Sequence, residues 1–400
     1  MTSTAAQMRA WTGPSLLTYG FRPFFLGAGV WAVLAMALWV PMLSGHVELP
    51  TRFDPVTWHA HEFLYGYLSA VVAGFLLTSV PNWTGRLPIV GWPLGGLFAL
   101  WVVGRLAVTL SSGLPVWLVV LADLSMLMTL AAVLSREIVA GQNWRNLAVL
   151  GMLGVLILGN GVFHFEAARG DYAAQGYGLR IGLGAGLMLI ALIGGRIVPS
   201  FTRNWLVRRG EGKLPVPPMR RFDKLALLLL AIGLALWIIA PQSEAAAIAV
   251  LIAGLAHLFR LTRWAGERSL SEPLLWVLHL AYALLPLGAF FMAIEILRPG
   301  MLGFAAAQHI WMAGTIGMMT LAVMTRATLG HTGNALHAGV GTTALYLCVF
   351  VAMIARLVAG VWPMQADLLY ALSGLAWIAG FGGFVLLYGP LFLRPLQGGH

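Results

Sequence analysis

Long apolar stretches, separated by short polar segments, run along almost the whole chain. A stretch of about twenty residues, at 1.5 Å per helical residue, matches the ~30 Å hydrocarbon core of a bilayer. The pattern therefore predicts an all-α, polytopic membrane helix bundle with about twelve transmembrane helices. Their predicted bounds, to within about four residues, are 24–43, 59–80, 92–110, 114–134, 146–168, 177–200, 222–240, 244–261, 273–297, 302–326, 338–357 and 368–390.

Composition supports a single integral membrane domain over residues 1–400, because 60% of the residues are hydrophobic and only 10% are charged. Soluble domains have about a quarter of charged residues. We expect no cleavable signal, since the first apolar run, beginning near Phe24, is long enough to span. The single cysteine, Cys348, lies in an apolar run, which excludes an intramolecular disulfide and a thiolate cluster. Histidine must therefore supply most ligands of any bound metal.

The net charge of +10 is explained by membrane topology rather than by nucleic-acid binding. Basic residues gather in alternate loops, as the positive-inside rule requires, so both termini are expected to face the cytoplasm. The longest inner loop, 201–221, is either a hinge between two halves or a basic loop that sets topology. The cations of the inner loops are Arg86, Arg136, Arg145, Arg203, Arg208, Arg209, Lys213, Arg220, Arg221, Arg260, Arg263 and Arg268, against Arg52, Arg169 and Arg298 outside.

Internal similarity appears when the chain is shifted by 118 and then by a further 130 residues. The first shift lays V-P-N-W-T-G-R (80–86) over V-P-S-F-T-R-N (198–204), and the two shifts together pair His61 with His309. The alternative is chance similarity in a chain rich in glycine and threonine. The hypothesis is three parallel four-helix repeats, in which the second, sixth and tenth helices are equivalent and central. Their bounds are 20–135, 145–262 and 272–392.

Histidines at one end of the spans form an outer layer. Ionisable groups in lipid cost several kcal/mol unless they are paired or ligated, so each is a functional candidate. Three imidazoles with an open position suit copper, zinc or iron, whereas the alternative is hydrogen bonding between helices. On a helix His59 and His61 lie about 200° apart, so both serve one centre only if His59 sits in an unwound start. The layer comprises His59, His61, His164 and His309, with Glu62 and Glu166.

A second group of histidines and arginines forms an inner layer. His257 and His279 lie at matching depths of consecutive antiparallel helices, as two axial haem ligands would, and Tyr282 follows His279 by three residues. The arginines either pair with haem propionates or extend to lipid headgroups. The layer comprises His257, His279, His331 and His337, with Arg196, Arg203, Arg260 and Arg326.

The two layers imply two separate sites. His309 and Arg326 are 17 residues apart on one helix, or roughly 25 Å. Asp123 and Arg105 lie within the fourth and third spans. They are either a structural salt bridge or a polar pair that links the layers.

Several motifs together resemble the NnrS family. They are G-F-R-P-F-F (20–25), W-H-A-H-E (58–62), P-N-W-T-G-R (81–86) and L-G-H-T-G (329–333). The similarity extends from Phe21 to about His337. The residues that match the family pattern are His59, His61, Glu62, Asn82, Trp83, Thr84, Arg86, Arg196, Pro199, Thr202, Arg203, Asn204, His279, Tyr282, His309, Thr325, Arg326 and His331. One departure is Asn334, where a basic residue is expected after H-T-G.

The resemblance implies a bacterial inner-membrane protein that contains haem, expected to be of b type, and copper, and that acts in nitric oxide stress and denitrification. Our hypothesis is that nitric oxide binds at an open metal position or is reduced with electrons from quinol. Glu62, Glu166 or Asp123 would serve as proton relays. The outer histidines are assigned to copper and the inner group to haem, although the outer histidines can equally ligate haem. Two alternatives remain, a metal or haem transporter and a non-enzymatic nitric oxide sensor or sink.

Overall fold

The structure is a computed structural model that describes residues 11–84 and 89–395, with the backbone alone for residues 82–84. Within these residues the chain forms helices and no strand. This confirms the predicted helical bundle and its twelve spans. The helices that are long and apolar enough to cross a membrane are Phe21–Leu43, Pro55–Pro81, Trp92–Thr109, Val116–Ala140, Trp144–Ala168, Tyr177–Leu206, Arg221–Ile239, Glu244–Thr262, Pro273–Leu297, Phe304–His331, Val340–Val361 and Pro363–Leu393.

Several of these spans extend beyond their predicted ends, and two of them extend far enough to include inner-layer residues. The sixth runs to Leu206, so that Arg196 and Arg203 are both helical. The tenth runs to His331, which was expected to follow the helix. Hydropathy marks where apolar residues stop, whereas a helix continues until its backbone is capped or broken. Both helices therefore extend past the apolar stretch that revealed them.

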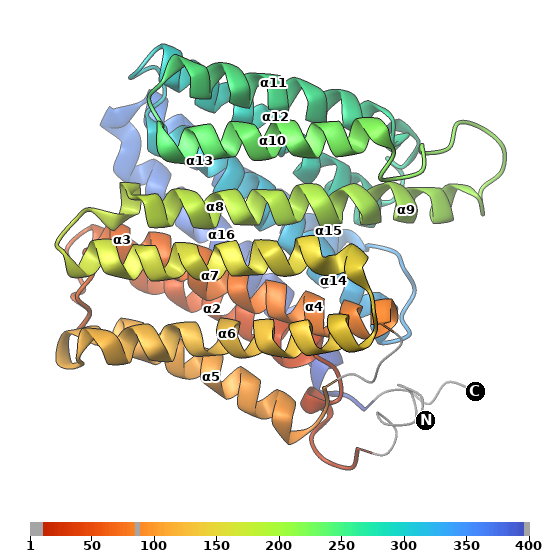
Figure 1. The fold of residues 1–400 in the computed structure, drawn as a ribbon, viewed down its shortest axis with the longest axis horizontal. Coiled ribbons are helices and arrows are strands. Elements are labelled where there is room, and N and C mark those ends of the chain that lie inside the picture. Colours follow the sequence, from red (N-terminus) through yellow and green to blue (C-terminus); the bar gives the residue numbers. More distant parts are fainter. Residues whose placement is uncertain (1–10, 85–88, 396–400) are drawn as a thin grey trace. The chain divides into compact units, whose positions relative to one another are not determined.

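The chain folds as two compact units, and Figure 1 labels their α-helices. The first comprises the described residues of Met1–Gly182, Ala327–Asn334 and Phe381–His400. In it α2 packs against α4, α5 against α6 and α6 against α7. Its helices are η1 (Ser15–Leu17), α2 (Phe21–Leu43), α3 (Pro55–His61), η2 (Glu62–Tyr67), α4 (Leu68–Thr84), α5 (Trp92–Thr109), η3 (Ser111–Gly113), α6 (Val116–Ala140), η4 (Trp144–Asn146), α7 (Leu147–Ala168), η5 (Ala173–Gln175) and the start of α8 (Tyr177–Leu189).

The second unit comprises Leu183–Arg326 and Ala335–Gly380. Here α10, α11 and α12 pack in sequence, and η8 packs against α12 and α15. Three helices, α8, α14 and α16, contribute residues to both units. The remaining helices are η6 (Ile190–Gly194), α9 (Gly195–Leu206), α10 (Arg221–Ile239), α11 (Glu244–Thr262), η7 (Gly266–Arg268), α12 (Pro273–Leu297), α13 (Phe304–His309), η8 (Ile310–Met318), α14 (Met319–His331), α15 (Val340–Val361), η9 (Pro363–Gln365) and α16 (Ala366–Leu393).

The second, sixth and tenth spans are the most buried of the twelve. In their most apolar stretches 83%, 72% and 72% of the residues are buried, against 28–61% in the other nine spans. Each also contains a π-helical segment, η2, η6 or η8. Such segments are rare and are often found at functional sites. These shared features agree with the predicted equivalence of the three helices, whereas the three four-helix repeats stay a prediction.

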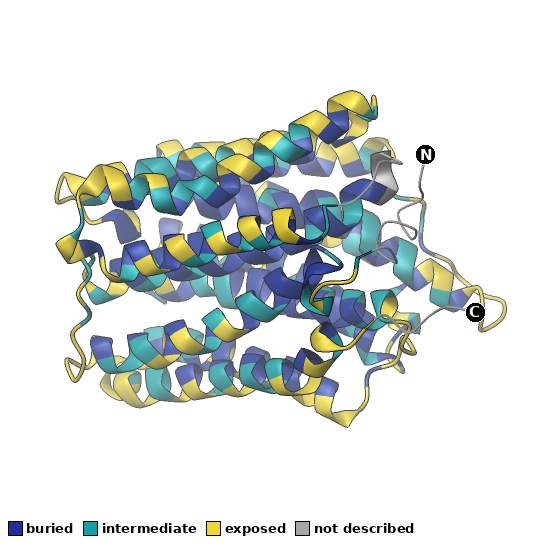
Figure 2. Ribbon diagram, turned by 90° about the horizontal axis from the view of Figure 1, so that it is seen from below, coloured by how far each residue is buried: buried dark blue, intermediate teal, exposed yellow. Residues whose placement is uncertain are grey.

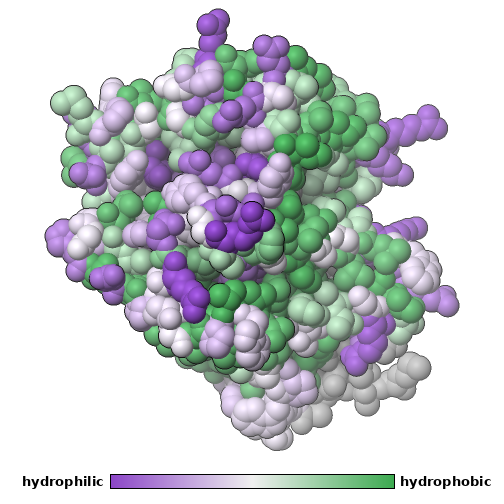
Figure 3. All heavy atoms as spheres, turned by 60° about the vertical axis from the view of Figure 1, so that its left-hand side comes forward, coloured by the Kyte–Doolittle hydropathy of each residue, from purple (hydrophilic) through white to green (hydrophobic). Residues whose placement is uncertain are grey.

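The other spans expose apolar side chains along one side, as Figure 2 shows by the alternation of yellow and dark blue along the ribbons. Among the exposed residues are Leu121 on α6, Leu158 on α7 and Ile252 on α11. In Figure 3 broad green areas of apolar surface adjoin smaller groups of purple, hydrophilic residues. Apolar side chains that face outward from a helix suit a lipid environment, in which each helix satisfies its own backbone hydrogen bonds. The chain is thus a multi-pass membrane protein.

Candidate metal centre

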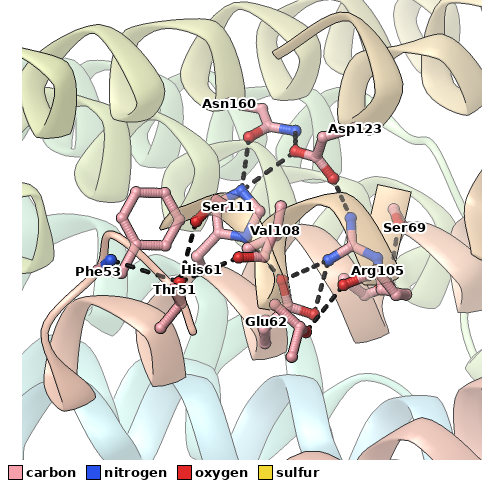
Figure 4. Close-up of polar contacts among 12 residues, drawn as sticks. Thr51, Phe53, His61, Glu62, Ser69, Arg105, Val108, Ser111, Asp123 and Asn160 are labelled. Atoms are coloured by element: carbon pink, nitrogen blue, oxygen red, sulfur yellow. Dashed lines mark hydrogen bonds and ion pairs between the residues drawn. The ribbon is translucent and has the colours of Figure 1, made fainter. Parts of the chain in front are cut away.

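A group of polar side chains from neighbouring helices of the first unit meets in the buried interior (Figure 4). All are at most 4% exposed. Polar groups in such a setting have to satisfy one another, because neither lipid nor apolar side chains can. The members are His61 at the end of α3, Glu62 at the start of η2, Arg105 on α5, Asp123 on α6, and Asn160 and His164 on α7.

The local sequence fixes where the second span begins. Asp54 accepts hydrogen bonds from the backbone N–H groups of Val56 and Thr57, both at 3.0 Å, and Pro55 occupies the first helical position. An acidic cap followed by proline is a strong start for a helix. His61 and Glu62 therefore enter the interior in the second turn.

Arg105 joins the two carboxylates of the group. Its Nη1 donates to both oxygens of Glu62, at 2.7 and 2.8 Å, and its Nη2 donates to Asp123 Oδ1. The polar pair of Arg105 and Asp123 expected from the sequence is confirmed, as a salt bridge within the outer group. Two carboxylates thus face one guanidinium. Because an unbalanced buried charge is costly, a further positive charge beside two ionised carboxylates would be favourable.

His61 stands where that charge would lie. Its Nδ1 is 3.0 Å from Glu62 Oε1, and its Nε2 is 3.1 Å from both Asn160 Oδ1 and Asp123 Oδ2. Asn160 Nδ2 donates to Asp123 Oδ2 at 2.8 Å, so the other end of its amide, Oδ1, faces His61. Both ring nitrogens of His61 thus face oxygen acceptors. This arrangement suits either a doubly protonated ring or a ring whose Nε2 is bound to a cation.

His164 completes a group of metal-ligating type. Its Nε2 lies 2.9 Å from Asp123 Oδ2, the oxygen that also faces His61. One potential ligand atom from each of His61, Asp123 and His164 lies within 4.8 Å of the others. Among the described residues, no other group of three or more His, Cys, Asp or Glu side chains has its potential ligand atoms this close together. Two imidazoles and a carboxylate form a donor set suited to copper, zinc or iron.

The residues present fit a metal for two reasons. Ligand atoms held at ~2.1 Å by one tetrahedral metal are ~3.4 Å apart, and the separations of Asp123 Oδ2 from the Nε2 atoms of His61 and His164 are 3.1 and 2.9 Å. Glu62 also bonds the other ring nitrogen of His61. Carboxylates in this position orient metal-bound imidazoles and raise their basicity.

Close helix packing brings the ligands together. A Cβ atom on Gly104 would lie only 3.1 Å from the Cα of Asp123, so α5 and α6 approach closely at this level. Aromatic rings surround the imidazoles. Phe53 lies 5.5 Å from the His61 ring and 5.9 Å from the His164 ring, and Phe163 lies 5.3 Å from His61. The site is therefore enclosed by apolar groups that exclude water.

A family model described as NnrS protein matches residues 15–395. The chain belongs to the NnrS family. This membership fits a membrane protein related to nitric oxide. A search of curated proteins gave no match.

The other outer-layer residues predicted from the sequence, His59, Glu166 and His309, have other contacts in the structure. The His59 ring stacks on Trp39 at 3.9 Å, on the α2 side of the helix. The start of the span is helical, so the unwound start that would let His59 join His61 is not present. Glu166 accepts hydrogen bonds from the backbone N–H groups of Tyr177 and Gly178, at 2.6 and 3.0 Å, at the start of α8. His309 belongs to the second unit, where its Nδ1 donates to the carbonyl of Ala305.

A buried chain of hydrogen bonds in the second unit involves His257. Its Nε2 donates to the carbonyl of Ala226 at 3.0 Å, and its Nδ1 accepts from the Tyr282 hydroxyl at 2.8 Å. Arg260 donates to the Tyr282 hydroxyl and, through Nε, to Asp223 at 2.9 Å. Both ring nitrogens of His257 thus form hydrogen bonds here, and its role as an axial haem ligand stays a prediction.

His279 is held differently. Thr202 donates to the carbonyl of Val198, so its oxygen accepts from His279 Nε2 at 2.9 Å. His279 and His257 therefore have different hydrogen-bond partners, and their assignment as a pair of axial haem ligands stays a prediction. Haem itself stays a prediction of the family resemblance.

The remaining inner-layer residues are distributed over both units. The Arg326 guanidinium lies over the ring of Phe201, 4.3 Å from its centroid, in the second unit. His331 packs in the first unit against Tyr19 and Phe21, at ring distances of 5.2 and 5.6 Å. Arg196 and Arg203 lie on α9. Of the family-pattern residues near Pro81, Arg86 and the side chains of Asn82, Trp83 and Thr84 lie outside the described residues.

Sequence reasoning missed Asn160. A neutral amide in an apolar span resembles an ordinary hydrogen-bonding residue. The available signal was its spacing from His164, since residues four apart lie on one face of a helix.

Proposed function

We propose that this NnrS-family protein binds nitric oxide at a metal ion held by His61, Asp123 and His164 and thereby lowers nitric oxide in a bacterial inner membrane. The observation that carries the proposal is the buried group of these three residues, whose potential ligand atoms lie within 4.8 Å of one another. Copper is the metal that the family resemblance implies. When bound there, it would supply a position for nitric oxide and a change of redox state.

The surrounding residues prepare the site for a small neutral ligand. Glu62 orients His61 through Nδ1, and Arg105 forms ion pairs with the carboxylates of Glu62 and Asp123. Phe53 and Phe163 shield the imidazoles from water. Nitric oxide is small and uncharged, so it dissolves in the lipid and reaches a buried site without a polar channel.

Reduction of two nitric oxide molecules to one nitrous oxide and one water would consume two electrons and two protons. We propose a quinol as the electron source. Glu62 and Asp123 belong to the network at the metal group and are the proposed proton relays. Glu166 is the weaker candidate, because both of its oxygens cap α8.

The experiment uses the purified full-length protein loaded with copper, a nitric oxide electrode and gas analysis for nitrous oxide, with and without a reduced quinol. We expect the wild-type protein to remove nitric oxide and the His61→Ala and His164→Ala variants to lose this ability. The matched control is His46→Ala, since His46 is exposed and lies outside the spans.

The products separate the possible activities. Nitrous oxide formed over many turnovers supports reduction, whereas stoichiometric uptake without product supports a sensor or sink. If the protein carries copper across the bilayer of proteoliposomes in the absence of nitric oxide, the result would instead support transport and contradict the proposal. Unchanged nitric oxide uptake by both histidine variants would also contradict it.

A further inference from the structure

Asn160 is wedged between two of the atoms that would hold the metal. Its Oδ1 lies 3.1 Å from His61 Nε2, and its Nδ2 donates to Asp123 Oδ2 at 2.8 Å. The side chain is fully buried. It comes from α7 one turn before His164, so both side chains point to the same side of that helix. Figure 4 shows the amide of Asn160 directed at His61 and Asp123 together.

The orientation of this amide follows from its partners. The Asp123 carboxylate only accepts hydrogen bonds, so the NH₂ group of Asn160 has to face it. The opposite orientation would place two oxygens against each other in a buried site and leave the NH₂ group without its acceptor, at a cost of about 1–3 kcal/mol. The oxygen Oδ1 is consequently held toward His61 Nε2.

The distances give Oδ1 the position of a ligand. His61 Nε2 is 3.1 Å from Asp123 Oδ2 and also 3.1 Å from Asn160 Oδ1. Both separations are close to the ~3.4 Å expected between two ligand atoms on one tetrahedral metal. An amide oxygen is a neutral and weak ligand, so it would add a donor atom to the two imidazoles and the carboxylate without adding charge.

We propose that Asn160 supplies a fourth ligand, through Oδ1, to the metal held by His61, Asp123 and His164. The inference rests on the proposed function only for the existence of that metal. It makes the donor set two imidazoles, one carboxylate and one amide oxygen. Because the amide oxygen binds weakly, the metal keeps the capacity to take a further small ligand.

The test is copper binding to the purified full-length protein, followed by electron paramagnetic resonance of the Cu(II) form and by competition with a chelator. In Asn160→Leu we expect about 10-fold weaker copper binding and a shifted copper hyperfine splitting, because an oxygen ligand is lost. Asn160→Asp retains an oxygen that can face the metal but replaces the donor to Asp123 by a second oxygen, so it should give a third, distinct spectrum. Asn146→Leu removes a buried amide at the start of the same span and should leave both readouts unchanged.

The outcomes separate this inference from the proposed function. If wild-type protein binds copper and the Cu(II) spectrum of Asn160→Leu is unchanged, Asn160 only positions its neighbours. That result overturns the inference but leaves the metal centre in place. Copper that is retained in His61→Ala and His164→Ala overturns the metal centre itself. Size-exclusion profiles and thermal unfolding identify any variant that has failed to fold, for which Asn160→Gln, with the same functional group, is the replacement.

Discussion

The guanidinium of Arg105 lies directly across Gly66, in the π-helical segment η2. A Cβ atom at Gly66 would be 2.5 Å from Arg105 Nη1 and 2.8 Å from Glu62 Oε2. The carbonyl of Gly66 also accepts a hydrogen bond from Trp101 Nε1 at 2.9 Å, so α5 is held against η2 by two residues one turn apart. Only a residue without a side chain leaves room for the ion pair at this point.

We therefore expect Gly66→Ala to separate Arg105 from Glu62. Overpacking of this kind costs about 1–3 kcal/mol, and the variant should also bind copper less tightly because Glu62 no longer orients His61. The measurements are thermal unfolding and copper content of the purified protein. Gly96→Ala on α5 is the control, since a Cβ there meets no atom within 4 Å. A variant at Gly66 as stable as that control would contradict the prediction.

The ion pairs predict a non-additive stability effect. Arg105→Leu leaves two buried carboxylates without their cation and should cost about 3–5 kcal/mol. Adding Glu62→Gln to it removes one of those carboxylates, so the double variant should be destabilised by less than the sum of the two single variants. A double-mutant cycle from unfolding in detergent measures this coupling. Strict additivity would show that Arg105 and Glu62 do not form a pair in the folded protein.

Metal content should follow the two-site prediction. His61→Ala and His164→Ala are expected to lose the same metal, whereas His59→Ala and His279→Ala are expected to retain it, because His59 stacks on Trp39 and His279 bonds Thr202. Elemental analysis together with the visible absorption of haem decides this. Loss of copper and haem together from His279→Ala would mean that a single site serves both.

A variant of Glu166 can distinguish a proton relay from a cap at the start of α8. Glu166→Gln should lower stability by about 1 kcal/mol, since it weakens the cap on the backbone N–H groups of Tyr177 and Gly178. Nitric oxide uptake by the folded variant should remain close to that of the wild type. If uptake ceases while the unfolding temperature stays unchanged, Glu166 is a proton relay and the structural role assigned to it is wrong.

The sequence predicted the spans because lipid imposes one rule on every helix, namely twenty apolar residues with an internally bonded backbone. It also indicated that His59 and His61 point to different sides, since residues two apart differ by about 200° on a helix. The pattern of apolar and polar positions did not reveal which polar residues would contact one another. Asp123 joins His164 and Asn160 only through the packing of α6 on α7.

Two further features had no sequence signal. The inner histidines were paired by depth alone, and depth does not reveal that His257 is already bonded to Tyr282 and Ala226. The π-helical segments likewise arise from a change of hydrogen-bond spacing that no residue type specifies. Glycine at position 66 is needed at η2, but glycine is common in this chain and therefore does not identify such a site.

The segment η2 has a consequence for the whole second span. A π-helical turn accommodates more residues than an α-helical one, so the helix is rotated after it, relative to an uninterrupted α-helix, by about the angle of one residue, ~100°. The faces of α3 and α4 are accordingly set independently of each other: α3 directs His61 toward the metal group, while α4 is free to match α2. Removal of a single residue from η2 would rotate α3 and α4 back into one continuous helical face. His61 could then face the metal group, or α4 could pack against α2, but not both at once.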